Sequence, residues 1–274
     1  MHKSHDLHTV LGRRILSSPL SPGYNYLTTI REQLAQYSPE ILRLRDTLDL
    51  AFAKGARGSK ACEDRVIFPL LVACRDIVEE ILFAVSEGFG RLALRSVRTM
   101  YECVVFARYL NLHPERTDDY MATFHAQWAK VLENVPDPVT TMPEVHNVIS
   151  AKVPAYAAGK YVDLVWSDKS ILKMAEEAGI PNQFHAWAFN YASGFVHPSG
   201  LFLIRHLSQG PGDVFEVSTK PQDDEAMLAL RISHSLILNA VDLRLKYAPL
   251  ATLQEGLEEC KKDFAKIWDY PPPI

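Results

Sequence analysis

One apolar stretch of the sequence carries three arginines and a glutamate at helical spacing. Arg91, Arg95, Arg98 and Glu102 stand at i, i+4, i+7 and i+11, so a helix would hold all four in one narrow stripe. A planar guanidinium binds phosphate or carboxylate through paired hydrogen bonds, which suits such a stripe to an anionic ligand. Because unpaired charge in an apolar interior is costly, the alternative is a buried network of ion pairs, from Arg98 to Glu102 and from the other arginines to carboxylates on neighbouring helices.

A second group of polar residues lies later in the chain, on a stretch rich in aromatic side chains. Asn190, Ser193 and His197 follow one another at i, i+3 and i+7 and would share one side of a helix, with Tyr191 beside them. Pro198 ends that helix at or just past His197, so the imidazole stands at a helix C-terminus. Polar groups among aromatic rings are typical of a ligand cleft, although a histidine next to a proline is also common as a structural residue.

Together the two groups would suit cleavage of a phosphodiester without a metal ion. A histidine takes or gives a proton in such a reaction, and arginines, here Arg95 and Arg98, stabilise the charge that develops on the phosphate. The catalytic candidates are His197, Arg98 and Glu102, and the candidate ligand-binding residues are Arg91, Arg95, Asn190, Tyr191 and Ser193. We expect no metal site and no cofactor, because the sequence contains no Glu-x-x-His pair, P-loop or G-x-G-x-x-G motif.

Helical periodicity runs through most of the chain and predicts an all-α protein. Apolar residues recur every three to four positions over residues 24–54, 59–88, 90–110, 114–135, 167–179, 181–197, 223–248 and 252–268. The Gly-Phe-Gly link at residues 88–90 predicts an antiparallel hairpin of the two long helices that it joins. The whole pattern predicts a bundle of long antiparallel helices, roughly seven to nine in number, and residues 214–217 alone indicate a strand.

The predicted organisation is a single helical domain between two tails. Residues 1–23 are polar and end in a Ser-Pro-rich run, which predicts a flexible N-terminal tail, and the proline-rich residues 269–274 predict an extended one. The helical domain takes residues 24–268. Within it the helical pattern weakens between residues 135 and 167, where prolines cluster, so we expect an irregular arm inserted into the bundle.

Composition is that of a soluble globular protein. The 274 residues carry a net charge of −4, which argues against a general electrostatic grip on nucleic acid but is compatible with a local basic stripe. The 4 cysteines form no C-x-x-C pair, as expected for reduced thiols in a cytoplasmic protein. No apolar run of about 18 residues and no signal-peptide core is present, so we expect no membrane association.

Two motifs give the chain a resemblance to known families. The pattern R-x-x-x-E at residues 98–102, followed by Y-x-S-x-x-x-H-P-S at residues 191–199, resembles a family of helical bacterial proteins of unknown function. More remotely, the chain is similar to the HEPN superfamily of helical ribonucleases and nucleotide-binding proteins. The catalytic pattern of that superfamily is an arginine followed four to six residues later by a histidine. Arg108 and His113 match this spacing, which also arises by chance in a chain of this composition, whereas residues 190–192 before His197 include no arginine.

The HEPN resemblance implies an RNA-cleaving effector of a bacterial defence or toxin system that works as a dimer. His197 would then need an arginine from the helix at residues 90–110. Two other functions fit the same residues: a non-catalytic helical module that binds an anionic ligand, a nucleotide or a partner protein, and a purely structural protein that associates through its helices. The expected partners are therefore RNA or a nucleotide, a second copy of the chain, or a partner protein.

Overall fold

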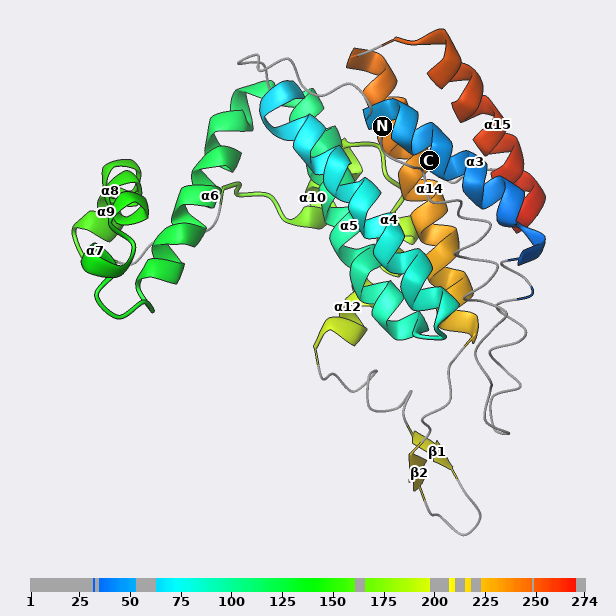
Figure 1. The fold of residues 1–274 in the computed structure, drawn as a ribbon, viewed down its shortest axis with the longest axis horizontal. Helices are drawn as coiled ribbons and strands as arrows, with labels where there is room; N and C mark the ends of the chain where they lie inside the picture. Colours follow the sequence, from blue (N-terminus) through cyan, green and yellow to red (C-terminus); the bar gives the residue numbers. More distant parts are fainter. Residues whose placement is uncertain are drawn as a thin grey trace, which may run out of the picture.

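The computed structural model describes residues 32, 35–52, 63–160, 166–197, 207–209, 215–217, 223–247 and 249–269. The predicted N-terminal tail lies outside these ranges, as do residues 270–274 of the predicted C-terminal tail. Over the described residues the protein is an α-helical bundle with one short two-stranded ribbon (Figure 1), which confirms the predicted fold class.

Long helices make up the bundle, and short ones connect them. In chain order the elements are α3 (Ser38–Phe52), the π-helix η1 (Glu63–Ile67), α4 (Phe68–Ser86), α5 (Gly90–Leu112), the 3-10 helix η2 (Pro114–Arg116), α6 (Thr117–Leu132), α7 (Pro138–Thr141), α8 (Pro143–Lys152), α9 (Pro154–Ala157), α10 (Ile171–Glu177), α11 (Asn182–His185), the π-helix η3 (Ala186–Tyr191), α12 (Ala192–Val196), β1 (Leu207–Gln209), β2 (Phe215–Val217), α14 (Asp223–Tyr247) and α15 (Ala251–Trp268). The predicted strand corresponds to β2, which pairs antiparallel with β1.

The hairpin of α4 and α5 is central to the bundle. Gly88 adopts a positive φ of 78°, a conformation that residues with a side chain rarely take. The link closes with a 2.7 Å hydrogen bond from the Phe89 amide to the Ala84 carbonyl. The chain therefore reverses within three residues, and α4 and α5 run antiparallel, as the Gly-Phe-Gly sequence predicts (Figure 1).

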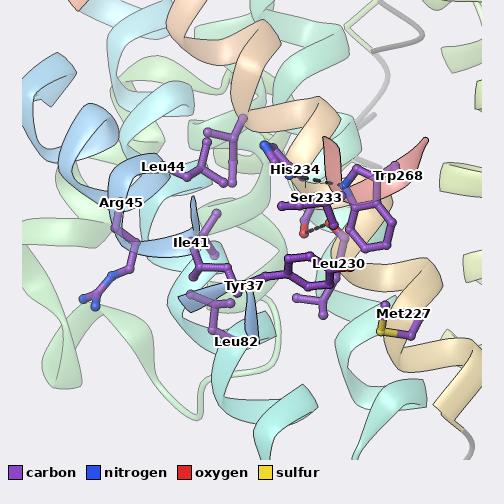
Figure 2. A pocket seen from close by; sticks show the side chains of 13 residues that line it. Tyr37, Ile41, Leu44, Arg45, Leu82, Met227, Leu230, Ser233, His234 and Trp268 are labelled. Atoms are coloured by element: carbon purple, nitrogen blue, oxygen red, sulfur yellow. Dashed lines mark hydrogen bonds between the residues drawn. The ribbon is translucent and has the colours of Figure 1, made fainter. Parts of the chain in front are cut away.

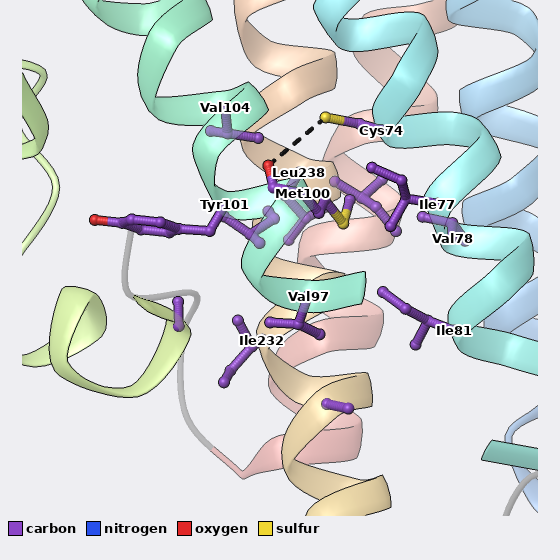
Figure 3. Packing of buried hydrophobic residues seen from close by; sticks show 14 of the residues in the cluster. Cys74, Ile77, Val78, Ile81, Val97, Met100, Tyr101, Val104, Ile232 and Leu238 are labelled. Carbon is purple, nitrogen blue, oxygen red and sulfur yellow. Dashed lines mark hydrogen bonds between the residues drawn. The ribbon is translucent and has the colours of Figure 1, made fainter. Parts of the chain in front are cut away.

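The two helices of this hairpin share a core with α14. The side chains labelled in Figure 3 come from α4 (Cys74, Ile77, Val78, Ile81), α5 (Val97, Met100, Tyr101, Val104) and α14 (Ile232, Leu238), and all of them are buried. Burying one aliphatic side chain of this size stabilises a fold by about 1.5–3 kcal/mol. The shared core thus fixes α5, and with it the arginine stripe, relative to the rest of the bundle.

Helix α14 has the length and the apolar composition of a helix that could cross a membrane. In the bundle 72% of its most apolar stretch is buried. Its first turn carries acidic residues and its last turn basic ones, the arrangement that favours the helix dipole. These features are those of a central core helix, which gives the apolar composition a structural reason.

A helical arm projects from the bundle between α5 and α10. Helix α6 leads outward, and α7, α8 and α9 cluster at its far end (Figure 1). Ala126, Ala129, Leu132 and Ile149 form a small separate core there. Of the irregular excursion predicted for residues 135–167, residues 135–160 form the outer part of this arm, where a proline at the first helical position begins each of α7, α8 and α9.

The helix after the arm begins later than predicted. The helical pattern begins at residue 167, but α10 begins at Ile171. Ser170 has the extended backbone of an N-cap, and its hydroxyl accepts a 3.3 Å hydrogen bond from the Lys173 amide. The Ser167 hydroxyl accepts a 3.1 Å hydrogen bond from the Lys169 amide instead. Two serines within four residues are equivalent by type, and backbone geometry selects the one that caps α10.

Candidate functional site

Arg98 joins α5 to the segment that carries His197. Its Nε donates a 2.8 Å hydrogen bond to the Ser193 hydroxyl, and its terminal nitrogens lie 3.2 Å from the Glu102 carboxylate. The guanidinium also lies 4.6 Å from the centroid of the Phe189 ring, within the range of a cation–π interaction. Arg98 is therefore held by three neighbours, and Glu102 balances its charge, as one of the two sequence interpretations predicts.

The Arg98–Glu102 pair is largely shielded from water. The side chains are 24% and 28% exposed. Burial raises the pKa of the Glu102 carboxyl, because the charged form loses hydration, and the Arg98 charge offsets part of that rise. The charge of Arg98 thus favours the ionised form of Glu102 in this position.

Arg95 reaches the same segment from the preceding turn of α5. Its Nε donates a 2.5 Å hydrogen bond to the backbone carbonyl of Phe195. Where the ion-pair interpretation predicts a carboxylate partner, the structure has an uncharged carbonyl, so the charge of Arg95 is not neutralised there. The residue is exposed, and its terminal nitrogens make no hydrogen bond within the described part of the chain. Those nitrogens are open to an anion from solvent.

His197 follows directly after α12, two residues beyond the carbonyl that accepts from Arg95. Its backbone is extended, with φ −116° and ψ 152°, so the helix ends at Val196 as the following proline predicts. The residue is exposed, and none of the described residues forms a hydrogen bond with its ring. The packing of α12 against α5 thus places the exposed guanidinium of Arg95 near the end of α12, and the exposed imidazole of His197 follows directly after that end.

The middle of this segment departs from the regular helix that the sequence predicts. α11, η3 and α12 follow one another without a break, and η3 is π-helical, with hydrogen bonds from i to i+5. The wider turn removes the α-helical spacing that would place Asn190 and Ser193 on one face. Ser193 contacts Arg98, whereas Asn190 is exposed to solvent. Single π-helical turns occur frequently at functional sites.

The two remaining predicted ligand-binding residues lie beside this contact. Tyr191 is half-buried and packs edge-on against Trp187 and against Phe195, with ring centroids 5.3 Å apart in both contacts. Arg91 is half-buried in the first turn of α5, one turn before Arg95. Tyr191 thus supports the shape of the helical segment, which is a different role from contact with a ligand through its hydroxyl.

A buried histidine that the sequence interpretation missed lies next to the site. Nδ1 of His185 is 2.8 Å from the Tyr101 hydroxyl, and the His185 ring stacks on Phe189 at 5.1 Å. Burial lowers the pKa of the His185 imidazole and raises the pKa of the Tyr101 hydroxyl, so both groups favour their neutral forms. Since Phe189 contacts both His185 and Arg98, this buried pair helps to position the guanidinium. The i, i+4 spacing of residues 185 and 189 is the signal that could have identified it.

The arginine and histidine that match the HEPN spacing are built into the fold elsewhere. Nε of Arg108 donates a 3.1 Å hydrogen bond to the Ala178 carbonyl, and its Nη1 bonds the side-chain oxygen of Asn239. Burial lowers the pKa of the Arg108 guanidinium. Nε2 of His113 lies 3.1 Å from the Glu177 carboxylate. Both side chains therefore hold the end of α5 against α10 and α14.

A small apolar cavity lies between α3, α4, α14 and α15 (Figure 2), with a volume of about 40 Å³. Nδ1 of His234 accepts a 3.3 Å hydrogen bond from the Trp268 indole at its edge. Burial lowers the pKa of the His234 imidazole to about 4, so this ring is neutral at pH 7. A space that holds about one water molecule cannot take a nucleic acid strand, and we exclude this cavity as a substrate site.

The chemistry available at the site is anion binding and proton transfer. The described residues contain no group of three or more His, Cys, Asp or Glu side chains that could hold a metal ion. The open groups are the cationic end of Arg95 and the imidazole of His197. A guanidinium of this kind binds phosphate or carboxylate, and an imidazole accepts or donates a proton near neutral pH.

Comparison with known proteins identifies the family to which the chain belongs. A family of unknown function (DUF5677) matches residues 64–214, which is more than half of the chain. No functionally curated protein and no solved structure matches the chain. The matched range contains α4, α5, the arm and the segment that ends at His197, so both halves of the site lie within it. The chain belongs to DUF5677, a family of unknown function.

Proposed function

We propose that the protein is a HEPN-like ribonuclease, in which His197 transfers a proton and Arg95 binds the scissile phosphate. The observation that carries the proposal is the 2.5 Å hydrogen bond from Arg95 Nε to the Phe195 carbonyl. This bond holds the exposed guanidinium by its inner nitrogen and leaves the terminal nitrogens open, two residues along the backbone from His197. A phosphate bound there by paired hydrogen bonds would have an imidazole as a neighbour.

RNA supplies its own nucleophile, so the reaction needs few protein groups. In the proposed step His197 accepts the proton of the 2′-hydroxyl while the 2′-oxygen attacks the phosphorus. The bond from phosphorus to the 5′-oxygen breaks, and that oxygen takes a proton from water. Arg95 stabilises the charge that develops on the non-bridging phosphate oxygens. Proton transfer by a positioned side chain accelerates such a step by about 10²–10⁴-fold.

Arg98, Glu102 and Ser193 act as positioning residues in this proposal. The contacts of Arg98 with Ser193 and Glu102 engage Nε and both terminal nitrogens, which makes Arg95 the better phosphate ligand. Arg98 joins α5 to α12. Glu102 neutralises the charge of Arg98, so the substrate phosphate binds Arg95 and not Arg98. The expected phenotype of their loss is therefore a misplaced His197 and a lower rate, with the chemistry unchanged.

The HEPN resemblance supports a cytoplasmic effector of a bacterial defence or toxin system that acts as a homodimer. An RNA-cleaving protein of that kind arrests the growth of the cell that makes it. The proposal can therefore be tested in a living host as well as with purified protein.

The test compares wild type with His197→Ala, Arg95→Ala and the control His113→Ala. Each protein is expressed in a bacterial host while growth and the integrity of total RNA are followed, and each purified protein is incubated with a labelled single-stranded RNA. We expect wild type and His113→Ala to cut RNA and arrest growth, and the other two variants to do neither. Intact RNA with purified wild-type protein, as monomer and as dimer, would overturn the proposal.

A non-catalytic module that binds an anionic ligand is the second candidate, and the open nitrogens of Arg95 favour it equally. It predicts that wild type and His197→Ala bind the same RNA or nucleotide with the same affinity and that neither cuts it. Arg95→Ala would then lose binding. This pattern separates the two functions, because cleavage requires His197 and anion binding does not.

A further inference from the structure

A cleft lies beside the proposed active site, between the segment formed by α11 and η3 and the helices α14 and α15. Its volume is about 290 Å³, near the lower end of the range for ligand pockets. Its walls include Gln183, Phe184, Trp187, Arg231, Ile232 and Phe264. The cleft is several times larger than the apolar cavity of Figure 2, and a larger share of its wall is polar.

The walls combine an aromatic surface with a cation. Phe184, Ile232 and Phe264 are buried and form an apolar base, whereas Trp187 is 42% exposed although it is a large apolar side chain. Arg231 adds a guanidinium, and Gln183 adds an amide on an exposed residue. Flat aromatic surface stacks on nucleobases of any sequence, and arginine binds the phosphate that accompanies them. A lipid chain would use the apolar walls alone, and a simple anion would use the arginine alone.

Aromatic contacts connect this cleft to the proposed active site. Trp187 packs on Tyr191, and Tyr191 packs on Phe195, each with ring centroids 5.3 Å apart. The carbonyl of Phe195 is the group that accepts from Arg95. Ten residues of helix, part of it π-helical, separate Trp187 from His197, which is about 15 Å or less given the α-helical rise of 1.5 Å per residue. A stacked nucleic acid strand covers that length with roughly four nucleotides at about 3.4 Å each.

We propose that the Trp187–Arg231 cleft binds a nucleotide of the RNA strand a few positions away from the phosphate that is cleaved. The base stacks on Trp187, and the positive charge of Arg231 in the wall attracts its phosphate. This inference rests on the proposed ribonuclease function, because it assigns a second contact point to the same strand. It makes binding depend on single-stranded RNA of at least about four nucleotides, since a shorter strand cannot reach both places.

The test measures the binding of 2′-O-methyl RNA, which cannot be cleaved because its 2′-oxygen is blocked. A labelled six-nucleotide strand and a two-nucleotide strand are titrated against wild type, Trp187→Ala, Gln183→Glu and the matched control Trp128→Phe in the arm. We expect Trp187→Ala to weaken binding of the longer strand about tenfold, within the range for loss of one stacked base. Gln183→Glu should also weaken it several-fold, because a carboxylate at the rim repels the strand, and Trp128→Phe should have no effect.

Intrinsic fluorescence gives an independent readout. Quenching by the longer strand should be lost in Trp187→Phe and retained in Trp128→Phe. Trp187→Ala binding within twofold of wild type, at an unchanged melting temperature, would overturn the inference. So would a two-nucleotide strand that binds as tightly as the six-nucleotide strand.

The outcomes for the cleft and for the proposed function are distinguishable. If Trp187→Ala loses binding of 2′-O-methyl RNA while wild type leaves unmodified RNA intact, the cleft stands and the ribonuclease fails. If unmodified RNA is cut in a manner that requires His197 but Trp187→Ala binds normally, the ribonuclease stands and the cleft fails. His197→Ala should bind the 2′-O-methyl strand as wild type does, because it keeps both contact points.

Discussion

Two arginine–histidine pairs, each with its arginine on α5, have opposite surroundings. Arg108 and His113 stand five residues apart and match a catalytic spacing, yet their side chains are bound to Ala178, Asn239 and Glu177. Arg95 and His197 are remote in sequence, do not match the arginine–histidine catalytic spacing, and are both exposed. The pair that matches a catalytic spacing is built into the fold, whereas the packing of α12 against α5 brings Arg95 to the segment that ends at His197.

Arg108 and Arg95 also differ in their electrostatic surroundings. Arg108 is half-buried, and burial lowers the pKa of its guanidinium; the Ala178 carbonyl and the Asn239 side chain replace water as its hydrogen-bond acceptors. Arg95 keeps contact with water and donates one hydrogen bond to a backbone carbonyl. A guanidinium whose donors are already satisfied has little to offer a phosphate. Availability of donors, rather than residue type, decides which arginine can bind a substrate.

The largest difference between the pairs should appear in RNA cleavage. His197→Ala removes the group that moves the proton and should lower the cleavage rate at least about 100-fold. His113→Ala breaks a contact with Glu177 on the surface and should leave the rate within about twofold. Single-turnover cleavage of a labelled RNA by both variants measures this. If His113→Ala were the slower enzyme, the assignment of the two pairs would have to be reversed.

The loss of stability should be larger for a substitution in the Arg108–His113 pair than for one in the Arg95–His197 pair. Arg108→Met leaves the Ala178 carbonyl and the Asn239 side chain without their donor and should reduce the free energy of unfolding by about 2 kcal/mol. Arg95→Met removes a single hydrogen bond at an exposed position and should cost about 1 kcal/mol or less. Urea denaturation of the two variants checks the comparison. Equal losses would contradict the view that only Arg108 is part of the framework.

The sequence predicts the fold well because helical periodicity and turn residues are local signals. The Gly-Phe-Gly link, the prolines of the arm and the long apolar faces all lead to the observed helices. The Arg98–Glu102 pair could also be predicted, because i, i+4 neighbours on one helix meet whatever the tertiary structure is. The arm and the bundle likewise follow from where these patterns strengthen and weaken along the chain.

The candidate site could be predicted only in part, because its decisive contacts are long-range. Arg95 donates to a backbone carbonyl 100 residues away, and no side-chain pattern marks a carbonyl as a partner. The π-helical turn of η3 shifts Asn190 away from Ser193, and the sequence predicts a regular helix there. Packing against α5 thus determines which of the predicted polar residues meet. Trp187 and Arg231 share a cleft for the same reason, since they come from different helices.

Ser193 lets the contact between α5 and α12 be tested at one oxygen atom. It accepts from Arg98 Nε and donates a 2.6 Å hydrogen bond to the Phe189 carbonyl. Ser193→Ala leaves Arg98 without this acceptor and should cost about 1 kcal/mol of stability and reduce the cleavage rate several-fold. Ser96→Ala on α5, the helix of Arg98, loses a single exposed contact with Glu80 and serves as the control in the same assays. An unchanged rate in Ser193→Ala would show that Arg98 does not position His197.

The smallest effect is expected from Glu102→Gln, which removes the charge beside Arg98 and keeps the shape of the side chain. Burial raises the pKa of the Glu102 carboxyl above its ordinary value of 4.5, so the folded protein holds this proton more tightly than the unfolded chain does. The stability that this group contributes is therefore complete below pH 4.5 and is lost as the pH rises through the raised pKa.

The glutamine variant lacks that loss, so at pH 7 it should be as stable as wild type or more stable, by less than about 1 kcal/mol, and the difference should vanish towards pH 4. Denaturation curves of both proteins between pH 4 and 7 measure this. A variant that is clearly less stable than wild type at pH 7 would mean that the ion pair outweighs the cost of burying Glu102. Arg98 would then be a structural arginine in the same sense as Arg108, and Arg95 would be left as the one arginine of the stripe with a demonstrated exposed end near His197.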